Sequence, residues 1–219
     1  MTEKLLVLVG SPRRNGNSAT LAEAVRRGAE AAGTNVALRF LDDHISGFLR
    51  DYRTCRRPDG ECTIADGYRA LFFDEFLPAR AVVFCSPIYW YGLSAQTKAF
   101  FDRSFCHYAA SNPNSKGVLQ AMSGKRLGVV LASEETYPGA ALGIVHQMQE
   151  FSRYIHSDFV GVVRGVGNSR GKVCNDPDDP IRQAERLGAE ILGRAYSDYR
   201  LDTKRAPVVW QEAPGTGAT

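Results

Sequence analysis

A stretch of small and polar residues near the N-terminus has the composition of an anion-binding loop. Its members that can donate hydrogen bonds or carry positive charge are Ser11, Arg13, Arg14, Asn15, Asn17 and Ser18. An apolar run, Leu5 to Val9, precedes this loop, and an alanine-rich helical pattern, Ala19 to Ala32, follows it. The free N–H groups and the dipole at the start of such a helix attract a phosphate, so an anion site is predicted here.

The spacing within this loop indicates which kind of phosphate ligand it can bind. Gly10 and Gly16 do not fit the dinucleotide pattern G-x-G-x-x-G, and the lysine of triphosphate-binding loops is missing. Hydroxyl and amide side chains stand where those loops have glycines, which favours a terminal monoester such as the phosphate of flavin mononucleotide (FMN). The alternative is an ordinary strand-to-helix turn, capped by Asn17 or Ser18, with Arg13 and Arg14 in solvent.

An aromatic loop has the right residue types to hold a planar ring. It follows the apolar run Ala81 to Cys85 and reads Ser86-Pro87-Ile88-Tyr89-Trp90-Tyr91-Gly92. Aromatic side chains offer flat apolar surface, and backbone N–H groups near Gly92 can stabilise negative charge on a reduced ring. Core or interface packing would explain three consecutive aromatic residues equally well. A further polar loop, Ser133 to Gly139, follows the apolar run Leu127 to Leu131.

Strands and helices alternate along the chain, and their order predicts where these loops lie. Three continuous apolar runs and the segments Asn35 to Leu41 and Phe159 to Val166 make five strands. Helical patterns follow them at 19–32, 66–77, 94–105, 141–155 and 180–199. We therefore expect an α/β three-layer sandwich with a five-stranded parallel sheet in the order 2-1-3-4-5. In that order the first and third strands end side by side, so the phosphate loop and the aromatic loop converge.

Three motifs together resemble one family. They are Gly10-Ser-Pro-Arg-x-x-Gly16-Asn-Ser, Ser86-Pro-Ile-Tyr-Trp-Tyr-Gly92 and Gln96-x-Lys98-x-Phe-x-Asp102-Arg103. The chain resembles the NADPH-dependent FMN reductase family and its flavodoxin-like relatives, from about Leu5 to Leu192. The resemblance implies that the FMN phosphate is held by Ser11, Arg13, Asn15, Asn17 and Ser18. It implies that the flavin ring is lined by Pro87, Ile88, Tyr89, Trp90, Tyr91 and Gly92, and closed on its far side by Ser133, Glu134 and Thr136.

The resemblance also implies an activity. NADPH or NADH would deliver a hydride to bound FMN, and a flat acceptor such as free flavin, a quinone or a related aromatic would receive it. Because the flavin carries this chemistry, no catalytic side chain is predicted. Lys98, Asp102 and Arg103 are expected to support their helix, and a homodimer or higher homo-oligomer is expected. The alternative is a flavodoxin-type electron carrier without its own small-molecule turnover, against which the sequence pI of 8.6 weighs, since such carriers are usually acidic.

Two further motifs suggest other chemistry. Iron-sulfur flavoproteins carry four closely spaced cysteines between the second and third strands, where this chain has only Cys55 and Cys62. We therefore expect no cluster and no other metal, and these two thiols are either inert or a redox pair. The string Gly167-Asn-Ser169-Arg-Gly171 matches the G-x-S-x-G elbow of hydrolases. A polar segment containing proline follows it instead of a helix, which argues against a hydrolase.

Composition fits a single α/β domain. The 219 residues, 44% hydrophobic and 23% charged, suggest one domain over 1–200, with a flexible tail or interface arm at 201–219. The net charge of +3 comes without basic runs interleaved with aromatics, so no nucleic-acid partner is predicted. Neither a signal peptide nor an apolar run of membrane-spanning length is visible, and the cysteine count is odd. We expect a cytoplasmic protein that binds no membrane.

Overall fold

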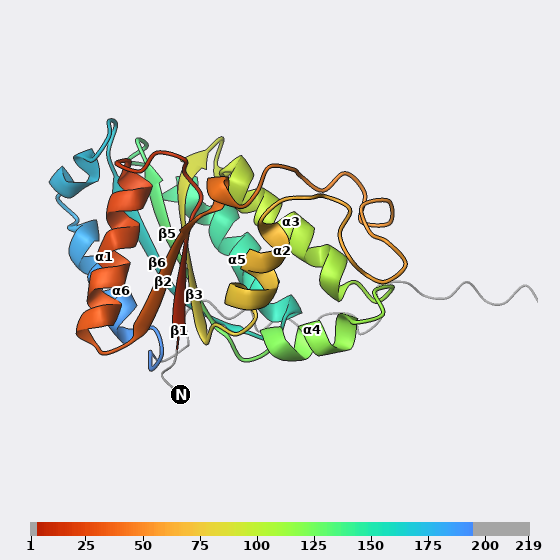
Figure 1. Cartoon of the computed structure of the whole chain (residues 1–219). Coiled ribbons are helices and arrows are strands. Elements are labelled where there is room, and N and C mark those ends of the chain that lie inside the picture. The colour runs from red at the N-terminus through yellow and green to blue at the C-terminus, as the bar shows by residue number, and fades with distance from the viewer. Residues whose placement is uncertain (1–3, 195–219) are drawn as a thin grey trace, which may run out of the picture.

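A parallel sheet forms the centre of the molecule in the computed structural model, which describes residues 4–194 (Figure 1). Its strands lie in the order β2-β1-β3-β5-β6. They span Lys4–Val9 (β1), Asn35–Phe40 (β2), Ala81–Tyr89 (β3), Arg126–Ser133 (β5) and Asp158–Val166 (β6). All four pairings along this path are parallel. The predicted five-stranded sheet is therefore confirmed, with a two-residue strand, β4 (Gly92–Leu93), added antiparallel to β3.

Helices cover both faces of this sheet (Figure 1). On one face lie α1 (Asn17–Ala31) and α6 (Pro180–Glu190). On the other lie α2 (Tyr68–Ala70), which continues as a π-helix over Leu71–Phe76, and α3 (Ala95–Tyr108) and α5 (Leu142–Tyr154). A further helix, α4 (Ser115–Met122), lies at the amino end of the strands. Short 3₁₀ turns occupy Leu41–Asp43, Pro138–Ala141 and Lys172–Asn175.

Alternation along each strand divides the core between the two helix layers. In β1, Val7 packs with the buried residues of α1 and α6, whereas Leu6 and Leu8 pack with those of α2, α3 and α5. Every residue from Leu5 to Val9 is fully buried. This explains why the central strands appear in the sequence as continuous apolar runs.

Two predicted helix ends are confirmed and one is wrong. After α1, Gly33 has φ +78°, and the Thr34 N–H donates to the Ala29 carbonyl at 2.9 Å, as in a glycine C-cap. The Asp179 side chain caps α6 by accepting from the Arg182 N–H at 3.3 Å. However, α6 ends at Glu190 rather than near residue 199, and a turn follows over 191–193. The predicted tail at 201–219 lies outside the described residues.

Two elements were not predicted, for identifiable reasons. The helix α4 is only eight residues long and contains Gly117, so its pattern is too short to show helical periodicity. The strand β4 has two residues and exists because the chain turns back on itself after β3. Both depend on neighbouring segments more than on local sequence.

Candidate functional site

The start of α1 has free N–H groups, as an anion site requires. Its N-cap residue is Gly16, and no side chain caps the helix. The alternative in which Asn17 or Ser18 caps an ordinary turn is therefore wrong. Ser11 and Ser18 are buried at this end of the helix, and the Ser11 Oγ accepts from the Arg13 N–H at 3.3 Å. The loop is joined to the next strand by the Gly10 N–H, which donates to the Cys85 carbonyl at 2.8 Å.

The two arginines of this loop have different surroundings. Arg14 donates to the Asp43 carboxylate at 2.5 Å and lies 3.9 Å over the Phe40 ring. The Arg14 guanidinium lowers the pKa of Asp43. The Arg13 side chain, by contrast, forms no hydrogen bond or ion pair with any residue of the described range 4–194. Of these two arginines, Arg13 can therefore contact a ligand without breaking an existing ion pair.

Asn17 connects the loop to a distant segment. Its Nδ2 donates to the Gly167 carbonyl at 2.8 Å, and its Oδ1 accepts from the Val173 N–H at 3.2 Å. Both polar groups of this side chain are therefore engaged with the chain that follows β6. The consequence is that residues after Gly167 are brought to the start of α1.

The aromatic loop is a tight hairpin with an unusual backbone. Tyr89 pairs with Gly92, and the two residues between them have positive φ, +50° at Trp90 and +59° at Tyr91. Such a conformation costs of order 1 kcal/mol for each non-glycine residue and persists only where the surroundings hold it. The Trp90 side chain is 97% exposed, so this hairpin presents an indole to solvent.

A serine pair holds this hairpin against the phosphate loop. The Ser94 N–H donates to the Ser86 Oγ at 3.1 Å, and the Ser94 Oγ donates to the Gly10 carbonyl at 2.6 Å. Ser94 also caps α3 by accepting from the Thr97 N–H at 3.4 Å. Both serines are fully buried. The first two predicted loops are therefore fixed to one another, as the strand order implied.

The loop after β5 forms the next wall. The Ser133 Oγ donates to the Glu135 carbonyl at 2.9 Å, which closes the turn after the strand. From β6, the Arg164 Nη1 donates to the Thr136 carbonyl at 3.2 Å. Ser133 is buried, whereas Glu134, Glu135 and Thr136 are exposed.

A cavity of about 250 Å³ lies where these loops meet, at the carboxyl ends of the strands. Nine of the predicted residues line it, namely Ser11, Arg13, Asn17, Ser18, Pro87, Ile88, Tyr89, Ser133 and Glu134. Five others lie on the same loops but are not among the lining residues, namely Asn15, Trp90, Tyr91, Gly92 and Thr136.

The cavity has a wall that the sequence interpretation missed. It consists of Gly167, Asn168, Ser169 and Arg170, which follow β6. All four of these residues belong to the string that matches a hydrolase elbow. In the structure, Gly171 has φ +71° and leads into a 3₁₀ turn, and no histidine bonds to Ser169 within the described residues. The carboxyl end of a fifth parallel strand was the signal that could have placed this segment at the site.

The described residues contain neither a disulfide nor a candidate metal site. All five cysteines are free, and within residues 4–194 no group of three His, Cys, Asp or Glu side chains could hold a metal ion. The Cys62 Sγ accepts from the Arg103 Nη2 at 3.8 Å, away from the cavity. In the same range, no helix is both long enough and apolar enough to cross a membrane.

The strand order and the cavity at the switch point define an α/β protein of the flavodoxin type. The chain belongs to the family described as having a flavodoxin-like fold, whose family model matches residues 3–178.

Individual relatives span almost the whole chain. One, from Bacillus subtilis, is assigned as an NAD(P)H-dependent FMN-containing oxidoreductase, YwqN; it is 26% identical over 88% of this chain and 98% of its own length. Another, the FMN-dependent NADH:quinone oxidoreductase of Methylorubrum populi, is 28% identical over 89% of this chain and 94% of its own. Among solved structures, the NAD(P)H:quinone oxidoreductase of Methanothermobacter marburgensis has a TM-score of 0.65 at 16% identity. That comparison covers 90% of this chain and 100% of the other, and it supports the fold alone.

Proposed function

We propose that the protein is an FMN-dependent oxidoreductase that takes electrons from NADPH or NADH and passes them to a flat acceptor such as a quinone. The names of the two sequence relatives support this class of reaction. The cavity supports it independently, because its walls combine a phosphate-binding loop with apolar and aromatic surface.

One observation carries the proposal most strongly: the uncapped start of α1 opens on a cavity beside an arginine without a partner in the described chain. A phosphate dianion would accept from the free N–H groups of the helix and pair with Arg13. The Ser11 and Ser18 hydroxyls are buried at the same place and add short donors. The residues present therefore fit an FMN phosphate. Since the Asn17 amide is already engaged, we assign its contribution to the backbone N–H rather than the side chain.

The flavin ring would lie between the aromatic hairpin and the loop after β5. Pro87, Ile88 and Tyr89 form one wall and Ser133 and Glu134 the other. Trp90, Tyr91, Gly92 and Thr136 would border the exposed edge of the ring, and Asn15 would lie at the phosphate end. Bound FMN would supply the electron-transfer chemistry, and the chain would bind the ring, orient it and offer backbone N–H groups to its charge.

Steady-state turnover distinguishes this enzyme from a flavodoxin-type carrier. With FMN present, the protein should oxidise NADPH or NADH in the presence of a quinone, and the rate should depend on FMN. The assay follows loss of absorbance at the wavelength of the reduced nicotinamide, with FMN alone as the control. A protein that binds FMN but shows no oxidation above that control would be a carrier and would refute the proposed activity.

We also propose a homodimer in the cytoplasm. An apolar groove of about 440 Å³ lies between α3 and α5, and Phe101, Phe105, Tyr108, Phe151 and Tyr154 are among its lining residues. A second copy would cover the exposed ring of Tyr154 and the half-buried rings of Phe105 and Phe151. The five free cysteines fit a reducing compartment.

A further inference from the structure

A second cavity adjoins the first along the chain that follows β6. Its volume is about 570 Å³, and it shares Glu134, Gly167, Asn168 and Ser169 with the first cavity. The two cavities are therefore neighbouring parts of one polar trough across the carboxyl edge of the sheet. FMN, in the proposed function, accounts for the first cavity only.

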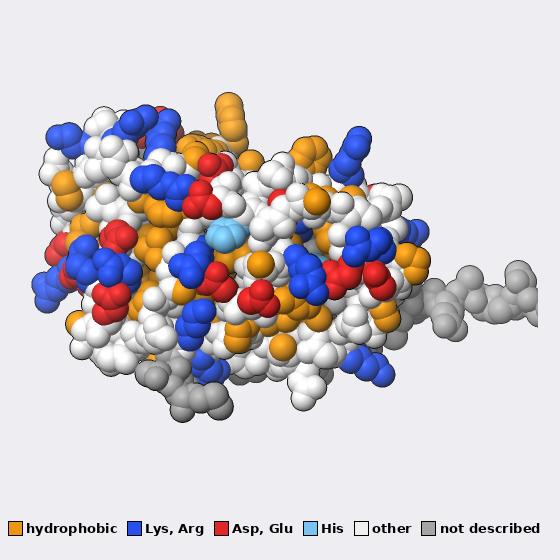
Figure 2. Space-filling view, in the orientation of Figure 1, with side chains coloured by type: hydrophobic (Ala, Val, Ile, Leu, Met, Phe, Trp, Pro, Cys, Tyr) orange, Lys and Arg blue, Asp and Glu red, His pale blue; other side chains and the backbone are white. Residues whose placement is uncertain are grey.

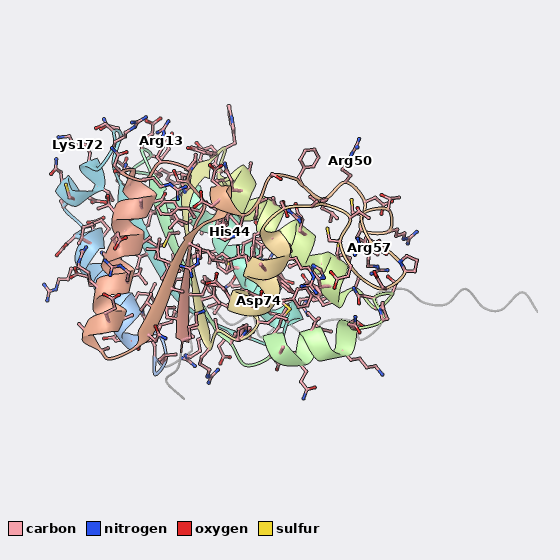
Figure 3. All side chains as sticks on the ribbon, in the orientation of Figure 1. Arg13, His44, Arg50, Arg57, Asp74 and Lys172 are labelled. Carbon is pink, nitrogen blue, oxygen red and sulfur yellow. The ribbon has the colours of Figure 1, made fainter. Side chains whose placement is uncertain are left out.

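The lining of the second cavity includes a positive charge that is unpaired within the described chain. Lys172 lines it and is exposed, and its ammonium forms no hydrogen bond or ion pair within the described chain. Arg170, on the neighbouring wall of the first cavity, is likewise without a partner there. Figure 2 shows Lys and Arg side chains gathered over the start of α1 and the chain after β6, and Figure 3 places Arg13 and Lys172 at this end of the sheet. Unpaired cations around a trough favour a ligand with more than one phosphate.

Carboxylates in the same cavity point to a nucleotide rather than to a bare anion. The two oxygens of Asp176 accept from the Val166 N–H at 2.6 Å and the Asp178 N–H at 3.0 Å, so this carboxylate is already satisfied. Glu134 and Asp178 are exposed on the lining and can accept from hydroxyl groups. Acidic side chains that accept from ribose hydroxyls, next to cations that meet phosphates, form a recurring arrangement for dinucleotides.

The loop that carries these groups is fixed without a ligand. Asn17 holds both Gly167 and Val173, and the Lys172 N–H donates to the Ser169 carbonyl at 3.2 Å. Gly171 has φ +71°, which reverses the chain between Arg170 and Lys172. A binding surface that is already ordered costs little conformational entropy to use.

We propose that the second cavity binds the adenosine-phosphate half of the nicotinamide dinucleotide, with Lys172 and Arg170 facing its phosphates. This proposal rests on the proposed function, in which NADPH or NADH is the electron donor, and it would place the nicotinamide against FMN in the first cavity. The bound donor would then extend from one cavity to the other along the lining residues that the two cavities share. Neither the phosphate loop nor the aromatic hairpin takes part in this recognition.

Equilibrium binding tests this site without relying on turnover. ADP, the part of the donor that would occupy the second cavity, is titrated by calorimetry into protein saturated with FMN and is expected to bind the wild-type chain. Lys172→Glu should weaken that binding about tenfold or more, because it replaces attraction by repulsion. The matched control is Lys116→Glu, the same charge change on α4 at the opposite end of the strands, which should alter binding less than twofold.

A kinetic ratio then connects the site to the donor. The ratio compares kcat/KM for the dinucleotide donor, NADPH or NADH, with kcat/KM for reduced nicotinamide mononucleotide, which lacks the adenosine half. Lys172→Glu should lower this ratio about tenfold, and Lys116→Glu should leave it as in the wild type. Absence of ADP binding, or equal binding of ADP by Lys172→Glu and the wild type, would overturn the proposal. If the wild type shows no turnover with either donor, the proposed function is refuted. The binding measurement would still decide whether the second cavity holds the adenosine-phosphate half.

Discussion

Two groups of basic side chains differ in what surrounds them. Arg103, on α3, is 1% exposed, donates to both oxygens of Asp66 at 2.5 and 2.8 Å, and lies 4.2 Å over the Tyr68 ring. Arg13, Arg170 and Lys172 border the cavities, are exposed, and have no partner within the described residues. Arg103 thus holds two parts of the fold together, whereas we propose that Arg13, Arg170 and Lys172 pair with phosphate groups of ligands.

The buried Arg103 side chain attaches a loop segment to α3. The Arg103 Nη1 also donates to the Gly47 carbonyl at 3.2 Å, so one side chain attaches both ends of the long 44–66 segment to α3. Asp66 accepts in addition from the Ser46 and Tyr68 N–H groups. Hydrogen bonds from Arg103 and these N–H groups outweigh burial and lower the pKa of Asp66. The segment without periodicity in the sequence is therefore ordered by a buried ion pair.

Removing Arg103 should have the largest effect on stability. Arg103→Ala leaves the Asp66 carboxylate buried without its cation, which should lower the free energy of unfolding by about 3–5 kcal/mol. Urea denaturation measures this loss. The double variant Arg103→Met with Asp66→Asn should recover much of it, since neither buried charge remains. An Arg103→Ala protein within about 1 kcal/mol of the wild type would show that the pair does not hold the segment.

His107, near this pair, should make stability depend on pH. Burial lowers its pKa to about 4, and it is 2% exposed among the rings of Phe72 and Tyr68. Between its unfolded pKa of about 6.5 and the folded value, the unfolded chain binds the extra proton. Stability should therefore fall as pH drops through this range, by about 3 kcal/mol in all.

The variant His107→Phe isolates this effect. Its free energy of unfolding, measured by urea denaturation from pH 7 to pH 4, should decline less steeply than that of the wild type. Parallel pH profiles for the two proteins would mean that another group is responsible.

Substitutions of Arg13 and Arg14 should have the smallest effects, and they test the phosphate site specifically. Arg13→Ala should raise the dissociation constant of FMN about tenfold, because a charge-assisted contact to the phosphate is lost. Arg14→Ala removes a half-exposed pair with Asp43 and should change FMN affinity less than about threefold. Flavin fluorescence titrations measure both constants. The reverse order of effects would mean that Arg14 leaves Asp43 to bind the phosphate.

Local patterns were sufficient to predict the central strands and the loops between them. Leu5 to Val9 and Ala81 to Cys85 are buried on both faces, so their apolar character is visible without any knowledge of their neighbours. Their order then places the first two loops at one edge. The cap at Asp179 depends on residues within three positions, which is also local.

What depends on distant partners could not be predicted. The Asn17 side chain bonds to Gly167 and Val173, some 150 residues away, and its position in the motif does not indicate these contacts. The sequence predicts only that Arg103 supports its helix, because its ion-pair partner Asp66 lies 37 residues away in the chain. The wall at Gly167 to Arg170 is a different case, because the predicted strand order already places the end of the last strand beside the strand before it.

Binding of FMN to the wild-type chain shows whether the cavity at the start of α1 is a flavin site. Titration followed by the visible spectrum and by flavin fluorescence should show saturable binding of one FMN per chain, weakened by Arg13→Ala. The proposal that the chain binds FMN would be contradicted if the protein, shown to be folded by circular dichroism, acquired no flavin spectrum at any FMN concentration.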